Sequence, residues 1–488
     1  MILKRFFDEG LAQASYLVAA ETSDAAIIVD PNRDVEQYLE AADDEKRRIT
    51  HVTETHIHAD FVSGARELAR RSGAQLLLSG EGGTDWQYRV ASEDAVVLLM
   101  NGDRFEVGEI AFDVVHTPGH TPEHLALFVT DGASADRPMG LFSGDFIFAG
   151  DVGRPDLLER AAGVTGTMEE SARALFQSLR RMRAYPDYLQ LWPGHGAGSA
   201  CGKSLGAMPS STLGYEKLFN WAFQTESEED FVRMVLAGQV EPPRYFARMK
   251  RLNRDGPPAR GAGPGRSPLD AARLAGVLRE KRAIVVDTRS STRFAAGFIP
   301  GTLNIPRGGS FATWAGSLLP ADHDLVLLVG NDGEEGAAAA AVLARALGLV
   351  GIDRVTGWAG AQVIDEMRRH VAGGALERMP TIGATELAAR ATDADILVID
   401  VRGEAEWEEG RIPGTVHHYL GTLADEIEQV PRDQPIVVTC QGGTRSSIAA
   451  SLLRTLGFEN VTNFSGGFAE WSGAGFTVER GDVSASTR

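Results

Sequence analysis

Two histidines and an aspartate alternate in the segment T-H-I-H-A-D-F, as His56, His58 and Asp60. Side chains at positions i and i+2 cannot share one helix face, but they can converge from a tight loop after a strand. Three further ligand-type residues stand beside Gly or Pro in similar loops: His120, Asp145 and His195. Imidazole and carboxylate groups gathered at one place are typical of a transition-metal site. We therefore expect these side chains to bind metal.

The order of apolar runs indicates which elements must position the candidate ligands. Strand-like runs end close to these residues, at Phe112–Val115, Leu125–Val129, Gly140–Phe142 and Leu189–Trp192. Helical stretches at 63–72 and 169–183 separate some of the runs, which favours a layered α/β domain whose sheet edge gathers the ligands. A lone histidine is more often structural, so we interpret His51, His116 and His124 as residues that orient or pack.

A cysteine loop near the C-terminal end is the second candidate for chemistry. Its residues are Cys440, Gln441, Gly442, Gly443, Thr444 and Arg445. The loop stands between the strand-like run Val437–Thr439 and a helical run that begins at Ser446. Free N–H groups and the positive dipole end of a helix stabilise a thiolate, and Arg445 can hold an anionic thiosulfonate or sulfite. The loop therefore predicts a catalytic sulfur nucleophile at Cys440.

The second half of the chain repeats itself. Two segments recur at a spacing of 113 residues, Ile284–Arg289 as Leu397–Arg402 and Ile299–Thr302 as Ile412–Thr415. Apolar β-branched runs alternate with helical stretches in each copy, which predicts two tandem α/β domains with largely parallel sheets. In the middle copy Gly330 stands at the position that we assign to Cys440. Glu335 likewise stands at the position of Arg445, so this copy lacks the chemistry.

Composition sets the domain boundaries that we expect. From Arg254 the sequence is too rich in Gly and Pro for helix or strand, which marks a linker. We place a metal-binding domain with a helical tail at 1–253 and the linker at 254–268. The inactive copy then spans 269–372, and the catalytic copy spans 380–484.

Charge and cysteine content bound the partners and the compartment. The formal net charge of −19 would repel phosphate backbones and anionic lipid, so we expect neither nucleic acid nor a membrane as partner. Two cysteines, Cys201 and Cys440, are too few for a disulfide framework, which favours a reducing compartment. The start of the chain lacks the apolar run of a signal peptide, and no run is long enough to span a bilayer. We expect a cytoplasmic protein.

The H-x-H-x-D run and the later G-H-T, G-D and G-H segments resemble the metallo-β-lactamase fold, an αββα sandwich. The stretches Gly150–Leu157 and Pro193–Lys203 resemble its persulfide dioxygenase branch more specifically. This resemblance implies that His56, His120 and Asp145 hold one Fe(II) per chain, with Zn as the alternative ion. Two histidines and one carboxylate with open positions suit non-haem iron and O₂ chemistry.

The sequence departs from the wider fold at one position. Dinuclear zinc hydrolases of this fold carry H-x-H-x-D-H, and here Phe61 replaces the last histidine and offers no ligand atom. A single metal is therefore favoured. Asp60 and His195 then remain from a second site, and His58 lies behind the ligands or serves as an occasional ligand.

Three residues near the ligands keep two interpretations each. Arg154 and Asp156 either form a salt bridge that fixes their loop, or orient Asp145 and meet an anionic substrate. Cys201 is either a small buried apolar residue or a sulfur carrier near the metal.

The cysteine loop, together with the strand end Asp400–Arg402 and the turn Ile412–Gly414, resembles the rhodanese family. The resemblance implies that the last copy is an active rhodanese. The middle copy is similar to a rhodanese without its chemistry, which favours a spacer, docking or domain-orienting role.

Together the resemblances imply a persulfide dioxygenase fused to two rhodanese-like domains. Its partners would be a low-molecular-weight thiol persulfide, O₂, and sulfite or thiosulfate, in sulfide detoxification. The alternatives are a thioester hydrolase like glyoxalase II and a sulfur-sensing scaffold with a structural metal. The sequence leaves open which thiol carries the persulfide, the direction of sulfur flux through Cys440, and the oligomeric state, homo-oligomers included.

Overall fold

The computed structural model describes residues 1–89, 94–162, 166–203, 205–259, 267–370, 376–390 and 396–481. The chain divides into two compact units, of which the first holds Met1–Arg260 with the short segment Gly348–Gly351 and the second holds the other residues. Among the described residues, no helix combines the length and the apolar character that crossing a membrane requires.

The described part of the first unit contains two mixed sheets of six strands each. The first sheet has the order β1 (Ile2–Asp8), β2 (Gln13–Ala19), β3 (Ala25–Val29), β4 (Arg48–Thr53), β5 (Gln75–Ser79) and β6 (Val96–Leu99). The second has the order β12 (Ser211–Thr212), β11 (Gln190–Pro193), β10 (Gly140–Gly144), β9 (Leu125–Asp131), β8 (Ile110–His116) and β7 (Arg104–Val107). The four strand-like runs expected from the sequence lie wholly or mainly within β8, β9, β10 and β11.

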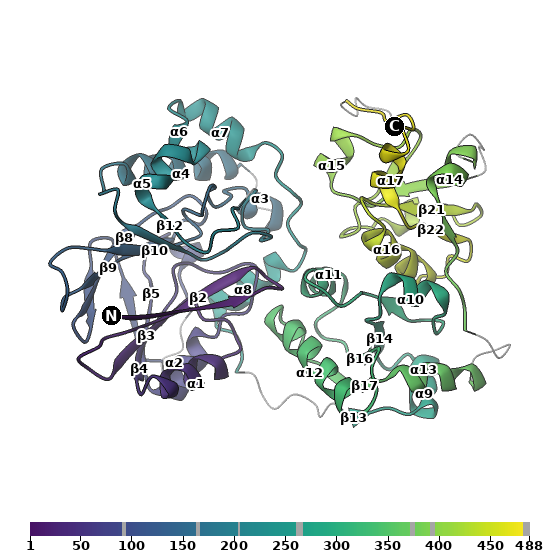
Figure 1. Cartoon of the computed structure of the whole chain (residues 1–488), viewed down its shortest axis with the longest axis horizontal. Coiled ribbons are helices and arrows are strands. Elements are labelled where there is room, and N and C mark those ends of the chain that lie inside the picture. The colour runs from purple at the N-terminus through teal and green to yellow at the C-terminus, as the bar shows by residue number, and fades with distance from the viewer. Residues whose placement is uncertain are drawn as a thin grey trace. The chain divides into compact units, whose positions relative to one another are not determined.

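Helices cover the outer face of each sheet, and the inner faces pack together (Figure 1). α1 (Glu36–Asp44) and α2 (Ala65–Ser72) pack on the first sheet. The second sheet is covered by α4 (Met168–Met182), α5 (Leu213–Phe219), α6 (Trp221–Gln224) and α7 (Glu228–Leu236). In α4, buried side chains recur three or four positions apart, at Ala172, Leu175, Leu179 and Met182, which forms one apolar stripe. The predicted αββα sandwich is confirmed.

Three further elements of this unit lie in its connections: η1 (Thr84–Trp86), α3 (Leu157–Ala162) and α8 (Phe246–Asp255). The helical tail therefore continues two residues beyond the boundary that composition suggested, because α8 includes Arg254 and Asp255. The predicted linker is also shorter at its other end, where Ser267 and Pro268 pair with β17 (Val355–Ala359) as β13. Residues 260–266 of that linker lie outside the described residues, as do the predicted domain ends at 372 and 484.

The second unit contains two sheets of parallel strands, and both sheets have the same strand order, as the internal repeat predicts. In the middle copy the order is β13 (Ser267–Pro268), β17, β16 (Leu325–Leu328), β14 (Ile284–Asp287) and β15 (Leu303–Asn304). In the last copy it is β18 (Thr381–Ile382), β22 (Val461–Phe464), β21 (Ile436–Thr439), β19 (Leu397–Asp400) and β20 (Val416–His417).

Helices connect successive strands in both copies. The middle copy has α9 (Ala271–Glu280), α10 (Ser291–Ala296), α11 (Phe311–Leu318), α12 (Gly333–Leu349), α13 (Ala361–Glu366) and η2 (Met367–Arg369). The last copy has α14 (Ala384–Arg390), α15 (Glu404–Glu409), η3 (Ile427–Gln429), α16 (Thr444–Thr455) and α17 (Gly467–Gly473).

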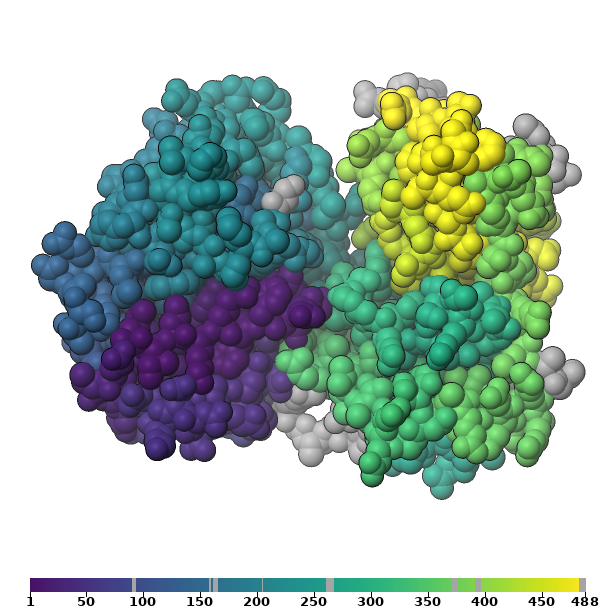
Figure 2. Space-filling view, viewed as in Figure 1, coloured from purple at the N-terminus to yellow at the C-terminus, as the bar shows by residue number. Residues whose placement is uncertain are grey.

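The two copies pack against each other, with the green middle copy and the yellow last copy meeting in Figure 2. Asn304, at the end of β15, joins them through buried hydrogen bonds. Its backbone amide donates to the Ser451 hydroxyl over 2.9 Å, and its side-chain oxygen accepts from the Ser447 hydroxyl over 3.2 Å. Both serines lie on α16, directly after the cysteine loop. The middle copy therefore contacts the helix that directly follows the loop of the predicted nucleophile.

Candidate metal centre and cysteine loop

Three of the predicted ligands converge at one edge of the sandwich. His56 follows β4, His120 follows β8 and Asp145 follows β10, and each side chain is at most 2% exposed. One ligand atom from each lies within 4.8 Å of the others. Nε2 of His120 and Nε2 of His56 stand 3.4 and 3.8 Å from Oδ2 of Asp145. The fold thus brings two imidazoles and one carboxylate to a single point.

Hydrogen bonds on the far side of each ring turn Nε2 toward that point. Nδ1 of His120 donates to the carbonyl oxygen of Arg154 over 2.9 Å. The Thr55 hydroxyl donates to Asp30 over 2.9 Å, so its oxygen accepts from Nδ1 of His56, 3.0 Å away. Both rings are therefore held in the tautomer whose Nε2 lone pair is free for a metal.

Burial keeps the two imidazoles in the neutral state that a metal requires. It lowers the pKa of His120 to about 4 and the pKa of His56 well below its ordinary value, so both rings are neutral at pH 7. Both carboxylate oxygens of Asp145 are buried, and neither has a hydrogen-bond partner of standard geometry among the described residues. Buried polar atoms without partners are costly, and a divalent cation would satisfy them. The donor set therefore fits a transition-metal ion.

The other histidine of the H-x-H pair does not join this cluster. Nε2 of His58 lies 3.1 Å from Oδ1 of Asp30, a buried carboxylate at the end of β3. Burial alone would lower the pKa of His58, but the charge and hydrogen bond of Asp30 outweigh it and raise the pKa to about 9. The ring of Phe61 packs on the His58 ring with centroids 4.4 Å apart. His58 thus lies behind the ligands, one of the two positions that the sequence left open.

A second cluster lies beside the first. Ligand atoms of Asp60, His195 and Cys201 lie within 4.8 Å of one another, and all three side chains are buried. Nε2 of His195 is 3.4 Å from Oδ2 of Asp60 and 3.5 Å from Oδ2 of Asp145. Burial raises the pKa of the Cys201 thiol well above its ordinary value, and the charges of Asp60 and Asp145 add to this effect. The sequence predicted Asp60 and His195 as remnants of a second site and left two interpretations for Cys201, and the fold places the Cys201 sulfur in this cluster.

Arg154 and Asp156 form a fully buried bidentate ion pair. Nε and Nη2 of Arg154 donate to the two carboxylate oxygens of Asp156 over 2.7 and 2.6 Å. The Arg154 backbone amide donates to the carbonyl oxygen of Cys201, and its Nη1 donates to that of Ala200. These contacts correspond to the loop-fixing interpretation, because the pair joins the loop that orients His120 to the loop that carries Cys201.

Two positioning residues had no sequence signal that we recognised. Asp30 accepts hydrogen bonds from the Thr55 backbone amide and hydroxyl over 2.6 and 2.9 Å, which fixes the start of the H-x-H loop. Asn253 on α8 donates to the carbonyl oxygens of His58 and Phe61 over 2.8 and 2.7 Å. Asp30 stands at a strand end, as the ligands do, and this shared position was the only available signal. Asn253 lies almost 200 positions along the chain from the loop that it holds.

In the last copy, Cys440 lies between β21 and α16 as predicted. It is 1% exposed, and its sulfur accepts a hydrogen bond from the Gly443 backbone amide over 3.1 Å. The Ser446 hydroxyl lies 3.5 Å from the same sulfur. Gly443 adopts φ +90°, and a Cβ there would lie 1.9 Å from the Ser465 carbonyl oxygen, so this turn requires glycine. The loop thus directs an amide at the sulfur.

Arg445 is engaged within its own copy. Its Nη1 and Nη2 donate to the two carboxylate oxygens of Glu406 over 2.5 and 2.7 Å. Burial would raise the pKa of Glu406, but the hydrogen bond and charge of Arg445 lower it below its ordinary value. Glu406 therefore balances the charge that the sequence analysis assigned to holding an anionic sulfur donor.

Strand register corrects the alignment of the two copies by one residue. Leu328 pairs with Asp287 in the middle copy, and Thr439 pairs with Asp400 in the last copy. The position of Cys440 is therefore taken by Val329 rather than Gly330, and that of Arg445 by Glu334 rather than Glu335. The connection between these paired strands is two residues longer in the middle copy, so the 113-residue spacing no longer applies in the loop. The middle copy still has no nucleophile there.

Comparison with known proteins agrees with this division of the chain. The model of the metallo-beta-lactamase superfamily matches residues 8–195, and that of the rhodanese-like domain matches residues 270–359 and 383–474. The crystal structure of a metallo-beta-lactamase from Staphylococcus aureus subsp. aureus COL is 39% identical to this chain. It aligns over 74% of this chain and 99% of its own, with a TM-score of 0.64.

Two further relatives share less sequence identity with this chain. A hydroxyacylglutathione hydrolase from Rhodospirillum rubrum is 30% identical over 181 residues, which are 37% of this chain and 60% of the relative. This chain therefore spans about 60% of the length of that curated relative. The crystal structure of ETHE1 from Myxococcus xanthus is 24% identical, covering 52% of this chain and 98% of its own, with a TM-score of 0.43.

Proposed function

The chain belongs to the metallo-beta-lactamase superfamily and carries two rhodanese-like domains, and from this premise we propose that it is a persulfide dioxygenase coupled to sulfur transfer. One observation carries the proposal, the buried set of His56, His120 and Asp145 at a single point. Two neutral imidazoles and one carboxylate are the ligands typical of non-haem iron enzymes that use O₂.

The proposed first reaction consumes one thiol persulfide, one O₂ and one water, and yields one thiol and one sulfite with two protons. The bond between the two sulfurs breaks, the outer sulfur is oxidised, and O₂ takes up the four electrons. An Fe(II) ion bound at the three residues would supply coordination positions for O₂ and for the persulfide sulfur. The chain itself orients the rings through Arg154 and Thr55 and keeps the site buried.

The proposed second reaction takes place at Cys440. The Cys440 thiolate attacks the outer sulfur of a persulfide, a new bond between sulfurs forms, and the thiol carrier leaves as a thiolate. Sulfite then attacks the outer sulfur of the Cys440 persulfide, so that thiosulfate forms and the Cys440 thiolate is regenerated. The Gly443 amide, 3.1 Å from the sulfur, supports the anionic form. The same steps can run in reverse, and we place the enzyme in sulfide detoxification.

The test is to prepare the full chain with iron and zinc both available and to count bound metal. O₂ uptake, sulfite and thiosulfate are then measured on a thiol persulfide. We expect one iron per chain, and we expect the O₂ consumed to equal the sum of the sulfite and thiosulfate formed. Zinc in both clusters without O₂ uptake would contradict the proposal.

One observation favours a second candidate, a thioester hydrolase like the hydroxyacylglutathione hydrolases among the relatives. Asp60, His195 and Cys201 form a cluster of three ligand types beside the first, with the carboxylate of Asp145 close to both. Two adjacent ions can activate a water for hydrolysis. In that case the protein would bind two ions per chain and hydrolyse a glutathione thioester without consuming O₂.

A further inference from the structure

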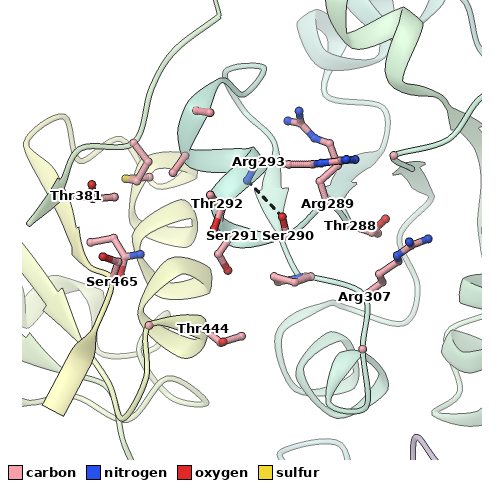
Figure 3. A pocket seen from close by; sticks show the side chains of 18 of the residues that line it. Thr288, Arg289, Ser290, Ser291, Thr292, Arg293, Arg307, Thr381, Thr444 and Ser465 are labelled. Carbon is pink, nitrogen blue, oxygen red and sulfur yellow. Dashed lines mark hydrogen bonds between the residues drawn. The ribbon is translucent and has the colours of Figure 1, made fainter. Parts of the chain in front are cut away.

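A cavity of about 1210 Å³ lies between the two rhodanese-like domains. The middle copy contributes the segment Thr288–Arg293 and Arg307, and the last copy contributes Thr381, Thr444 and Ser465 (Figure 3). Pockets of a few hundred to about 1,000 Å³ are typical for organic ligands. Thiosulfate or sulfite, with a handful of heavy atoms each, would occupy a small part of this one.

The cavity reaches the loop that holds the proposed nucleophile. Gly443 lines it, and the backbone amide of Gly443 donates to the Cys440 sulfur over 3.1 Å. Asn463 lines it as well, is 3% exposed, and its side-chain oxygen has no hydrogen-bond partner in the described structure. A buried amide oxygen without a partner is costly, which indicates that a ligand or water completes this site.

The charged groups of the lining are all positive. Arg289, Arg293, Arg307 and Arg378 line the cavity, and its described lining includes no Asp or Glu. Asp287 balances Arg289 through a bidentate ion pair with a shortest distance of 2.6 Å. Within the described residues, Arg293, Arg307 and Arg378 have no side-chain ion pair. Three uncompensated arginines on a chain with a net charge of −19 indicate a site for an anion.

The repeat shows that this charge is specific to the middle copy. At the 113-residue spacing, Arg293 takes the position of Glu406, which in the last copy neutralises Arg445. Arg293 lies beside the loop of its own copy that corresponds to the cysteine loop. Its Nη1 is 3.4 Å from the position that a Cβ on Gly330 would take. The copy without a nucleophile thus supplies cations to the cavity, while the arginine of the copy with the nucleophile is already paired.

We infer that this cavity binds an organic thiol, or its persulfide, that carries several anionic groups. Arg293, Arg307 and Arg378 would hold those groups, which are phosphates or carboxylates, while the sulfur reaches the Cys440 loop. Arginine clusters bind both groups through paired N–H donors. The middle copy would then be a domain that binds the thiol for the last copy, rather than a spacer. This inference rests on the proposed sulfur transfer at Cys440 and names the carrier class.

Binding is tested on the full chain by titration calorimetry, with coenzyme A as the phosphate-bearing probe, glutathione as the carboxylate-bearing probe, and thiosulfate. We expect at least one organic thiol to bind, and the double variant Arg293→Ala with Arg307→Ala to weaken that binding about tenfold or more. Arg279→Ala, an exposed arginine of the same copy outside the lining, is the matched control and should not change it.

Binding of coenzyme A would identify phosphates as the anionic groups, and binding of glutathione would identify carboxylates. Equal binding by the wild type and the double variant would overturn the inference, as would no binding of either organic thiol. The inference would also be overturned if the double variant lost binding of thiosulfate but not of the organic thiols. The site would then bind a small inorganic anion.

A kinetic measurement separates this inference from the proposed function. With the persulfide of the bound thiol as sulfur donor, the double variant should raise KM about tenfold and leave kcat within about twofold. If the wild type transfers no sulfur at all, the proposed function fails, and the calorimetric result still decides whether the cavity binds an anionic thiol. A kcat that falls while KM stays constant would contradict a binding role.

Discussion

The backbone amide of Asp145 donates a hydrogen bond to Nε2 of His124 over 3.1 Å. Nε2 must therefore be unprotonated, and Nδ1 of the same ring donates to the Thr117 hydroxyl over 2.8 Å. Burial lowers the pKa of His124 well below its ordinary value, which keeps the ring neutral. On sequence alone His124 is a residue that orients or packs, and in the structure it orients the backbone of a candidate ligand.

Replacing His124 by Phe should weaken metal binding by about 10- to 100-fold, because the ring volume stays but the acceptor for the Asp145 amide is lost. Competition with a chelator of known affinity measures this change on the full chain. His51→Phe is the control, since His51 is only half-buried and stacks on Phe105 at 6.4 Å, away from the ligands. Equal affinities for the His124 variant and the wild type would show that Asp145 needs no such support.

The two clusters should separate on mutation. His120→Ala removes one of three ligands from the first cluster and should abolish both metal retention and O₂ uptake. Asp60→Asn alters only the second cluster and should leave one iron bound. Metal analysis of both variants, prepared in parallel, is the measurement. If the Asp60 variant loses its iron as well, the two clusters form one site with shared ions, and the hydrolase candidate gains support.

The middle copy should remain inactive even with a cysteine installed. In a Cys440→Ser background, we expect neither Val329→Cys nor Gly330→Cys to restore thiosulfate:cyanide sulfurtransferase activity. The acidic residues Glu334 and Glu335 would repel a thiolate and an anionic donor alike. Testing both positions covers both alignments of the loop. Turnover above the Cys440→Ser background would show that the middle copy kept a working anion site.

The variant Cys440→Ser separates the two proposed chemistries. It keeps the size of the side chain but replaces the thiol with a hydroxyl, which ionises far less readily near neutral pH. We expect sulfurtransferase activity to vanish, O₂ uptake to persist, and product to shift from thiosulfate to sulfite. O₂ uptake, sulfite and thiosulfate are measured side by side for this variant, for Cys201→Ser and for the double variant with both replacements.

The Cys201→Ser comparison identifies the other outcomes. Thiosulfate that persists in the Cys440 variant and disappears when Cys201 is also replaced would assign sulfur transfer to Cys201. Thiosulfate that persists in the Cys440→Ser variant and in the double variant would indicate a spontaneous reaction of sulfite with persulfide. Lost O₂ uptake in the Cys440 variant would mean that the two reactions are coupled.

Sequence pattern alone was sufficient for the features that depend on local order. The pattern placed His56, His120 and Asp145 directly after apolar strands, and the family resemblance implied that these three form one metal site. The single sheet edge that we expected is wrong, because β4 belongs to the first sheet while β8 and β10 belong to the second. The tandem domains followed from the repeated segments, and the position of Cys440 followed from a strand, glycines and a helix. In the middle copy, the loop that corresponds to the cysteine loop was aligned wrongly by one residue. Only the pairing of Leu328 with Asp287 determines the register there.

Tertiary packing decided which distant side chains share a site. The sequence left Cys201 as either a buried apolar residue or a sulfur near the metal, and packing decided that its sulfur lies beside Asp60 and His195, in a loop that Arg154 holds. Glu406 neutralises Arg445, although the two are 39 positions apart. Contacts of this kind depend on how whole elements pack, whereas a pattern records only neighbours along the chain. For the same reason, only the packing of the two copies could reveal that the one without a nucleophile places its arginines beside the loop of the other.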